Sequence, residues 1–408
     1  MPVEEPSPPD SRSAAEFIAL VALTTSLVAM SIDSMLPALG DIAAELGAGD
    51  PNDRQLVITT FFAGLTAGLA FWGPVSDSTG RKRALFASIG LFIAGGLVCA
   101  TATHFMTMLI GRGIQGVGAA GPRIVAVAMV RDLHAGRRMA RVMSFVTSAF
   151  IVVPVLAPSI GQAVLLIAHW RAIFFGLVAV AIIDLLWLGL RQPETLPRAR
   201  RVRFSARTIA RAAGEAFSSR VTFGYTLANG FVFGAFMSYL GTSQQIFQEQ
   251  YDLGRLFPVF FGLLAVAIGA ASLVNARLVM RFGMRALSKW ALRADCALSF
   301  GFLVIVWAIG GHPPLAAFMV YMSLCFFCNG LLFGNYNARA MEPMGHIAGV
   351  AAAVIGSVST TISLAAAIPI GLAYDGTVIP LVAGFALLGL AALLATEWAE
   401  RGQVGQVG

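Results

Sequence analysis

The chain has 408 residues, of which 57% are hydrophobic and only 12% are charged. Soluble domains average about 25% charged residues, so this composition excludes an ordinary soluble enzyme. The net charge of +7 comes from cations placed between apolar segments, which argues against a nucleic-acid-binding protein.

Apolar runs recur along nearly the whole chain, and a helix of about 20 such residues spans the hydrocarbon core of a bilayer. We predict an all-α integral membrane protein with twelve transmembrane helices in two six-helix halves related by pseudo-two-fold symmetry. The predicted spans lie near residues 17–39, 55–76, 84–104, 105–130, 142–165, 171–190, 220–241, 256–277, 287–310, 314–337, 347–370 and 377–397.

The polar segments divide the chain into five regions. We expect a disordered cytoplasmic tail (1–15), an N-terminal bundle (16–190), a basic cytoplasmic linker (191–219), a C-terminal bundle (220–397) and a cytoplasmic tail (398–408). Most Lys and Arg residues fall on one side of this topology, so the positive-inside rule places both termini in the cytoplasm. The N-terminal tail lacks a basic region, which argues against a cleaved signal peptide. The linker is expected to touch anionic lipid headgroups.

Helix one carries Asp33 within an otherwise uncharged run, and a charge at membrane depth is costly and typically functional. The turn after helix two, 73–83, combines Gly73, Asp77 and Gly80 with three basic residues. Its glycines permit close helix approach, and Asp77 can pair with an inner-face arginine to form a breakable latch. A second copy after helix eight has Met280 where the acid would fall, so a matching latch in the C-terminal half is not expected.

Helix four carries Arg112 in a glycine-rich stretch that predicts tight packing against a neighbouring helix. Arg112 and Asp33 lie at a similar depth, roughly 10 Å from the outer ends of their predicted helices, so they could meet. A buried acid beside a guanidinium suits a proton-binding switch. The alternative is a static ion pair that only fixes helix packing.

Helix five places Pro154 and Pro158 four residues apart, followed by Gly161. Such a helix can kink and pack closely, as a gating helix must, although an ordinary proline kink gives the same pattern.

Several of these motifs resemble those of the major facilitator superfamily. The 73–83 turn resembles its Gly-x-x-x-Asp-x-x-Gly-Arg-Arg/Lys signature, and 112–116 resembles its Arg-x-x-Gln-Gly motif. Segments 153–162 and 31–39 are similar to those of Bcr/CflA-type drug:proton antiporters, with Ile160, Gln162 and Met35 as departures. The resemblance implies a transporter in which Asp33 and Arg112 couple protons and Gly73, Asp77, Gly80, Arg81 and Arg131 form an inner gate.

Other intramembrane charges are interpreted as structural. Arg123 and Asp184 have similar depths that permit a pair, and Arg293 and Asp295 are expected to reach the interface near the inner end of helix nine. The four cysteines are interpreted as packing residues. Helical spacing suggests a substrate pocket, although packing explains any single member equally well. Its candidates are Met30, Gln115, Asn229, Phe233, Phe236, Asn329 and Tyr336.

The resemblance implies export of small amphiphilic drugs of the phenicol or bicyclomycin class in exchange for protons. We expect a multi-pass protein of the bacterial inner membrane, in monomeric form, with no cofactor, no metal and no nucleic-acid partner. No Gly-x-x-x-x-Gly-Lys-Ser/Thr phosphate loop is present, so an ion gradient must supply the energy. The alternatives are a proton-coupled uptake symporter and, more remotely, an integral membrane enzyme, for which the acids and histidines do not cluster.

Overall fold

The computed structural model describes residues 11–134, 136–202 and 205–401. Helices account for nearly all of the described chain, and no strand occurs within it. The first half contains α1 (Ser11–Asp33), α2 (Leu39–Leu46), α3 (Leu56–Thr79), α4 (Arg81–Ala100), α5 (Phe105–Leu133), α6 (Gly136–Ile167) and α7 (Arg171–Arg191). The second half contains α9 (Arg220–Gln244), α10 (Phe257–Ala308), α11 (Leu315–Met341), α12 (Ala348–Leu372) and α13 (Ile379–Glu400). Short helical turns connect them: η1 (Leu36–Ala38), η2 (Pro51–Gln55), η3 (Arg198–Arg200), η4 (Gln245–Gln250), η5 (Gly254–Leu256) and η6 (Glu342–Ile347).

Eight segments of the described chain are long and apolar enough to cross a membrane. Two of them each contain two helices: Gly254–Ala308 is broken at Gly283, where φ is 75°, and Leu315–Leu372 holds α11 and α12. Adding α6 (32 residues) and α9 (25 residues) gives twelve helical limbs of membrane-spanning length. The predicted all-α fold with twelve spans is therefore confirmed.

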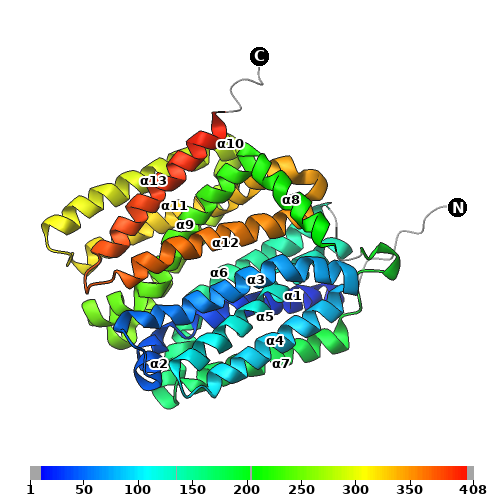
Figure 1. The fold of residues 1–408 in the computed structure, drawn as a ribbon, viewed down its shortest axis with the longest axis horizontal. Helices are drawn as coiled ribbons and strands as arrows, with labels where there is room; N and C mark the ends of the chain where they lie inside the picture. The colour runs from blue at the N-terminus through cyan, green and yellow to red at the C-terminus, as the bar shows by residue number, and fades with distance from the viewer. Residues whose placement is uncertain (1–10, 135, 203–204, 402–408) are drawn as a thin grey trace.

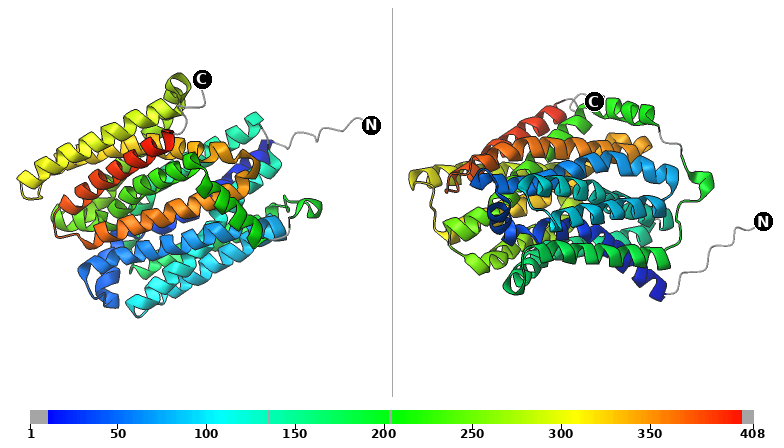
Figure 2. Two further views of the ribbon diagram at one scale, coloured as in Figure 1. Left: turned by 45° about the horizontal axis from the view of Figure 1, so that its top comes forward. Right: turned by 60° about the horizontal axis from the view of Figure 1, so that its bottom comes forward.

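The two halves lie side by side, as Figure 1 shows, with α1 and α3 to α7 in one group and α9 to α13 in the other. Helix α3 packs against α12 and helix α6 packs against α10, so these two pairs join the halves. Figure 2 shows the same division from two other directions, with the helices of both halves running nearly parallel. We call the end that holds the α3–α4 turn and the linker the basic end.

The glycines of α5 explain how tightly the first half is packed. A Cβ added at Gly118 would lie 2.6 Å from the Cα of Phe92 in α4, and one at Gly116 would lie 2.9 Å from the backbone nitrogen of Leu65 in α3. Real Cβ atoms do not approach this closely, so only glycine lets α5 touch both neighbours. The predicted close packing of this helix is confirmed.

Helix α1 ends earlier than predicted, at Asp33 rather than near Leu39. The hydroxyl group of Ser34 donates to the carbonyl oxygen of Met30 at 2.5 Å, and Pro37 has no backbone N–H to continue the helix. The chain therefore turns through η1 before α2 begins. Asp33 is thus the last residue of α1, and its expected depth of roughly 10 Å from the outer end of that helix was wrong.

The helix ends also differ from the expected tails. Residues 11–15, expected in a disordered tail, belong to α1, while 1–10 and 402–408 lie outside the described residues. Within the 191–219 linker the chain forms η3 and the helix α8 (Ala206–Ser218), which packs against α12 and α9. The linker is therefore partly folded onto the bundle.

Candidate functional site

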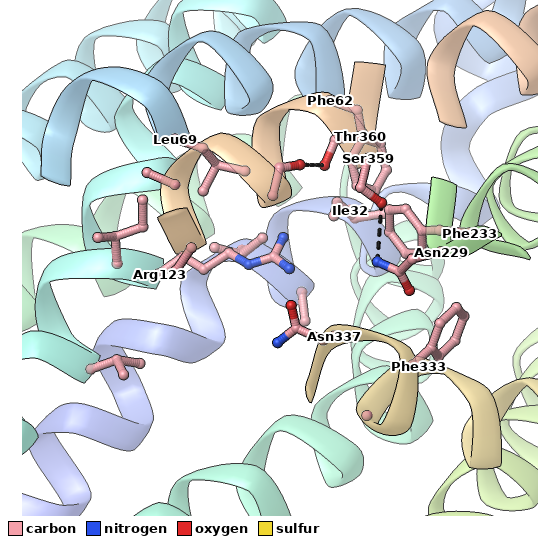
Figure 3. Close-up of a pocket in the computed structure, with 18 of the residues that line it drawn as sticks. Ile32, Phe62, Leu69, Arg123, Asn229, Phe233, Phe333, Asn337, Ser359 and Thr360 are labelled. Carbon is pink, nitrogen blue, oxygen red and sulfur yellow. Dashed lines mark hydrogen bonds between the residues drawn. The ribbon is translucent and has the colours of Figure 1, made fainter. Parts of the chain in front are cut away.

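A cavity of ≈ 710 Å³ lies between the two halves, a size typical of small-molecule sites. It is lined by α1, α3, α5, α6 and the first residue of α4 from the first half and by α9 to α12 from the second. Its lining extends from Asp33 to Asp77, Arg81 and Arg131, and so reaches the basic end. Figure 3 shows side chains from both halves facing this space.

Asp33 lines the cavity at the end of α1. The residue is 5% exposed and has neither a hydrogen bond nor an ion pair among the described residues. A buried acid without a partner is costly in its charged form, so it favours a proton.

Arg112 does not pair with Asp33, so the predicted contact is absent from this structure. The guanidinium group of Arg112 is fully buried and donates to the carbonyl oxygen of Val57 at 3.0 Å and to Oε1 of Gln115 at 2.6 Å. It also lies 4.4 Å from the ring centroid of Phe61. These contacts hold the arginine inside the first half, away from the cavity lining.

Arg123, interpreted as structural from the sequence, lines the cavity and is exposed in it. It does not pair with Asp184, whose Oδ1 accepts a hydrogen bond from the hydroxyl group of Thr24 at 2.8 Å. Asp295 does not reach the interface either, because it is 3% exposed in the core of the second half. Arg293 is more exposed and its Nη2 lies 3.2 Å from Oε1 of Glu397.

An aromatic wall and a few amides face the rest of the cavity. The ring of Phe233 lies 5.9 Å from Phe62, 5.9 Å from Phe236 and 5.8 Å from Phe333, all measured between centroids. Beside this wall Nδ2 of Asn229 donates to Oγ of Ser359 at 3.0 Å. Three pocket candidates, Asn229, Phe233 and Phe236, therefore line the cavity. The other four are absent from its lining: Met30, Gln115, Asn329 and Tyr336.

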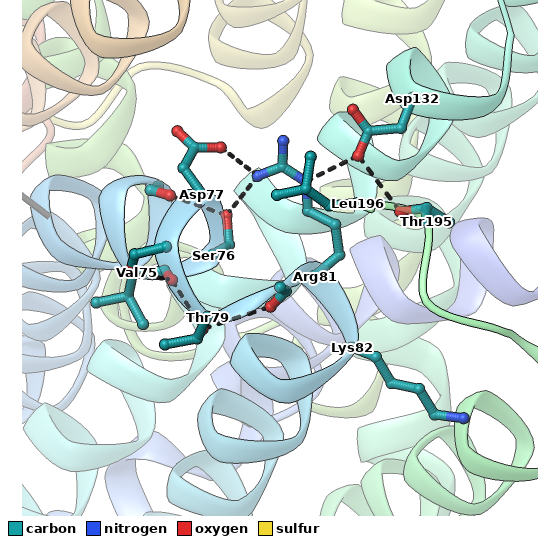
Figure 4. Close-up of polar contacts among 12 residues, drawn as sticks. Val75, Ser76, Asp77, Thr79, Arg81, Lys82, Asp132, Thr195 and Leu196 are labelled. Atoms are coloured by element: carbon teal, nitrogen blue, oxygen red, sulfur yellow. Dashed lines mark hydrogen bonds and ion pairs between the residues drawn. The ribbon is translucent and has the colours of Figure 1, made fainter. Parts of the chain in front are cut away.

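At the basic end Arg81 holds the predicted latch (Figure 4). Its guanidinium group pairs with Asp77, donates to Oγ of Ser76 at 2.8 Å, and lies 2.9 Å from Oδ2 of Asp132 through Nε. The predicted pairing of Asp77 with an inner-face arginine is thus present. Arg131 lines the cavity, but the neighbouring Asp132 makes the contact with Arg81.

The linker is attached to the same turn. Oε1 of Glu194 accepts the backbone N–H of Arg81 at 2.9 Å, which caps the start of α4. The turn itself depends on Gly80, whose φ of 106° favours glycine. The backbone N–H of Val202 donates to the carbonyl oxygen of Asp77 at 3.0 Å. The latch and the linker therefore form one unit.

The proline-containing helix α6 lies between the halves. Pro154 lines the cavity, and Gly161 packs directly against the backbone of Ser34, where a Cβ would lie 3.2 Å from its Cα. On the other side Gly262 of α10 approaches Val155. Helix α6 thus touches the end of α1 and the second half at once, which places it where a gating helix would act.

The opposite end of the cavity is closed by η2. Arg54 pairs with Glu249 of η4 and donates to Oε1 of Gln244 at 2.7 Å. Asn52 donates to the carbonyl oxygens of Leu372 at 3.1 Å and Tyr374 at 2.8 Å. Within the described chain, Arg54–Glu249 is the ion pair that joins the two halves. The structure is therefore closed at this end, while its cavity extends to the basic end.

Sequence reasoning assigned no role to Arg54, Asp132 or Glu194, and it interpreted Arg123 as structural. The sequence held one signal for Asp132, because it directly follows the predicted gate residue Arg131. Adjacent residues of a helix point about 100° apart, so the two side chains cannot both face the same partner. No local pattern distinguishes Arg54 or Glu194, whose partners lie far away in sequence.

Comparison with known proteins identifies the family. The family model described as Major Facilitator Superfamily matches residues 21–368. The chain belongs to this superfamily. As a major facilitator it is a multi-pass membrane transporter rather than an enzyme.

Among related major facilitators, an uncharacterized MFS-type transporter of Bacillus subtilis, YdgK, is 31% identical over 83% of this chain and 84% of its own length. A bicyclomycin resistance protein homolog of Haemophilus influenzae is 27% identical over 84% of this chain and 85% of its own length. The structure of the E. coli xylose transporter XylE in a partially occluded inward open conformation shares the fold. It has a TM-score of 0.70 at 13% identity and covers 96% of this chain and 98% of its own.

Proposed function

We propose that this major facilitator exports small, amphiphilic drugs from a bacterial cell in exchange for protons. The single observation that carries this proposal is the position of Asp33, a buried acid without a partner in the described chain, in the same cavity as the aromatic wall. Cargo and proton can therefore compete for one space. The relative named as a bicyclomycin resistance protein homolog supports the drug class.

The basic end is the cytoplasmic side in this proposal, because Arg81, Lys82, Arg83 and the linker arginines gather there. Both termini are then cytoplasmic, and the protein acts as a monomer in the inner membrane with the proton as its coupling ion and no cofactor. The two pairs of helices that join the halves, α3 with α12 and α6 with α10, are the surfaces along which the halves rock.

The cycle follows from these placements. Cargo enters the cavity from the basic end and displaces the proton from Asp33. The closure at Arg54 then opens while the basic end closes, and the cargo leaves. Asp33 takes a proton from the opposite side, and its neutral form favours return to the state described here.

The test measures proton flux in proteoliposomes that contain a pH-sensitive dye. A chloramphenicol gradient should drive protons in the opposite direction through the wild-type protein, and Asp33→Asn should abolish this flux. Asp184→Asn is the matched control, because Asp184 is an equally buried acid that lies outside the cavity lining. It should keep the flux.

Unchanged drug-driven proton flux in Asp33→Asn would contradict the proposal. Proton movement in the same direction as the drug would instead identify the uptake symporter.

A further inference from the structure

Arg123 is a cation without a partner in the middle of the transport cavity. It is exposed in the cavity and has neither an ion pair nor a hydrogen bond among the described residues. Figure 3 shows its guanidinium group directed into the open space, between Asn337 on one side and the Asn229–Ser359 pair on another. No ion pair or hydrogen bond within the described residues therefore explains why a cation stands at this position.

The depth of Arg123 makes its position costly. The predicted span of this helix ends at Val130, seven residues after Arg123, so the residue lies about 10 Å inside the membrane from the basic end at 1.5 Å per residue. That is about a third of the way into a hydrocarbon core about 30 Å thick. A charged residue at this depth usually serves a substrate or ion pathway.

Among the described groups that line the cavity, Asp33 is the acid left to balance the charge of Arg123. Asp77 pairs with Arg81 at the basic end, and Arg131 adds a second positive charge there. Asp33 is the remaining acid of the lining. Whenever Asp33 carries a proton, the central part of the cavity is positive.

A positive cavity rejects cationic cargo. At a separation of about 6 Å and an effective dielectric constant of about 20, repulsion between two unit charges weakens binding about 100-fold. An anion would be attracted, but it would cancel the positive charge of Arg123 and so strengthen proton binding in the same cavity. Cargo and proton would then bind together, which is the linkage of a symporter rather than an exchanger.

We propose that Arg123 sets the charge class of the cargo by donating hydrogen bonds to the oxygen atoms of uncharged amphiphiles and by excluding lipophilic cations. This inference rests on the proposed exchange of drug for protons. The five N–H donors of the guanidinium group suit carbonyl, nitro and hydroxyl oxygens. The exposed amide of Asn337 adds a further polar group, and the aromatic wall receives the apolar part of the cargo.

The test is equilibrium binding to the full-length protein in phosphatidylcholine nanodiscs without any gradient. The probes are chloramphenicol, which is uncharged and rich in oxygen acceptors, measured by calorimetry, and ethidium, a lipophilic cation, measured by fluorescence against empty nanodiscs. Arg123→Gln should bind chloramphenicol about tenfold more weakly, because a charge-assisted hydrogen bond is lost. The same variant should bind ethidium about 100-fold more tightly than the wild-type protein does.

Two further variants make the result specific. Arg123→Lys keeps the charge and should still exclude ethidium, which tests the proposal even if Arg123→Gln proves unstable. Arg83→Gln removes one positive charge from an exposed position after the α3–α4 turn and should change neither affinity.

Ethidium binding to the wild-type protein as tight as to Arg123→Gln, or unchanged affinities for both probes in Arg123→Gln, would overturn the inference. Failure of the proposed function gives a different result. A protein that lacks drug-driven proton flux but shows the expected shift in probe affinities retains the binding role of Arg123 and loses only the exchange mechanism. Drug-driven proton flux without a shift in probe affinities would leave the exchange mechanism in place and overturn the binding role of Arg123.

Discussion

The contact between Arg54 and the second half should control how often the cavity opens at the end opposite the basic end. The side chain of Arg54 is 9% exposed, whereas that of Glu249 is 48% exposed, so solvent weakens this ion pair to about 1 kcal/mol. The hydrogen bond from the same guanidinium group to Gln244 is buried and contributes about 1 kcal/mol more. Arg54→Ala should therefore favour the open form by about 2 kcal/mol, or about 30-fold in population.

Distances between two spin labels measure this shift directly. All four native cysteines are buried, so labels can be attached at Ala44→Cys on α2 and Ala373→Cys after α12, where both alanines are exposed. Double electron–electron resonance in nanodiscs should show a long-distance population in Arg54→Ala that is scarce in the otherwise unchanged protein.

The matched control is Arg171→Ala. Arg171 also pairs with an acid at this end, but its partner Glu45 belongs to the same half. Its removal should leave the distance distribution unchanged. A distribution for Arg54→Ala that matches that of Arg171→Ala would refute the assignment of Arg54 as the closing contact.

Two further predictions concern stability. Gly64→Ala should lower the free energy of unfolding by about 1–3 kcal/mol, because its Cβ would lie 2.9 Å from the carbonyl carbon of Gly113. A Cβ at Gly90 would meet open space, so Gly90→Ala should leave the free energy of unfolding unchanged. Equal thermal unfolding of the two variants would contradict this reasoning. Asp132→Asn should destabilise the protein by about 1–3 kcal/mol, since it leaves the nearly buried Arg81 with a weaker partner. Asp77 is more exposed, so Asp77→Asn should lower the free energy of unfolding by about 1 kcal/mol or less. A larger loss for Asp77→Asn than for Asp132→Asn in thermal unfolding would contradict this order.

The sequence was sufficient for the number of helices and for the tight packing of α5, but not for the partners of the buried charges. Runs of apolar residues set the number of spans, because the bilayer demands a fixed helix length. The glycines of α5 predicted close packing for a similar reason, since only small residues permit it. Both inferences depend on local sequence alone.

The proposed pair of Asp33 and Arg112 failed for two physical reasons. Its depth was counted from a helix end that Ser34 and Pro37 move to Asp33. Equal depth also says nothing of rotation about the helix axis, and Arg112 faces Phe61 inside its own half. Arg123 shows the opposite error, because it was interpreted as structural and yet lines the cavity. A cavity arises where two halves fail to meet, and no pattern within α5 records where that happens.

The strength of the Arg54 closure can be compared with the energy that one proton supplies. A proton that crosses 100 mV gains about 2.3 kcal/mol, and a difference of one pH unit adds about 1.4 kcal/mol. In the proposed exchange of one proton against an uncharged drug, one net charge moves, so both contributions are available in each cycle. The Arg54 closure, at about 2 kcal/mol, lies within that supply, so one proton suffices to break it. Removing one partner of a fully buried ion pair costs about 3–5 kcal/mol, so a closure of that strength would use most or all of this supply. The half-exposed position of Glu249 is therefore suited to a contact that must break and re-form at every turnover.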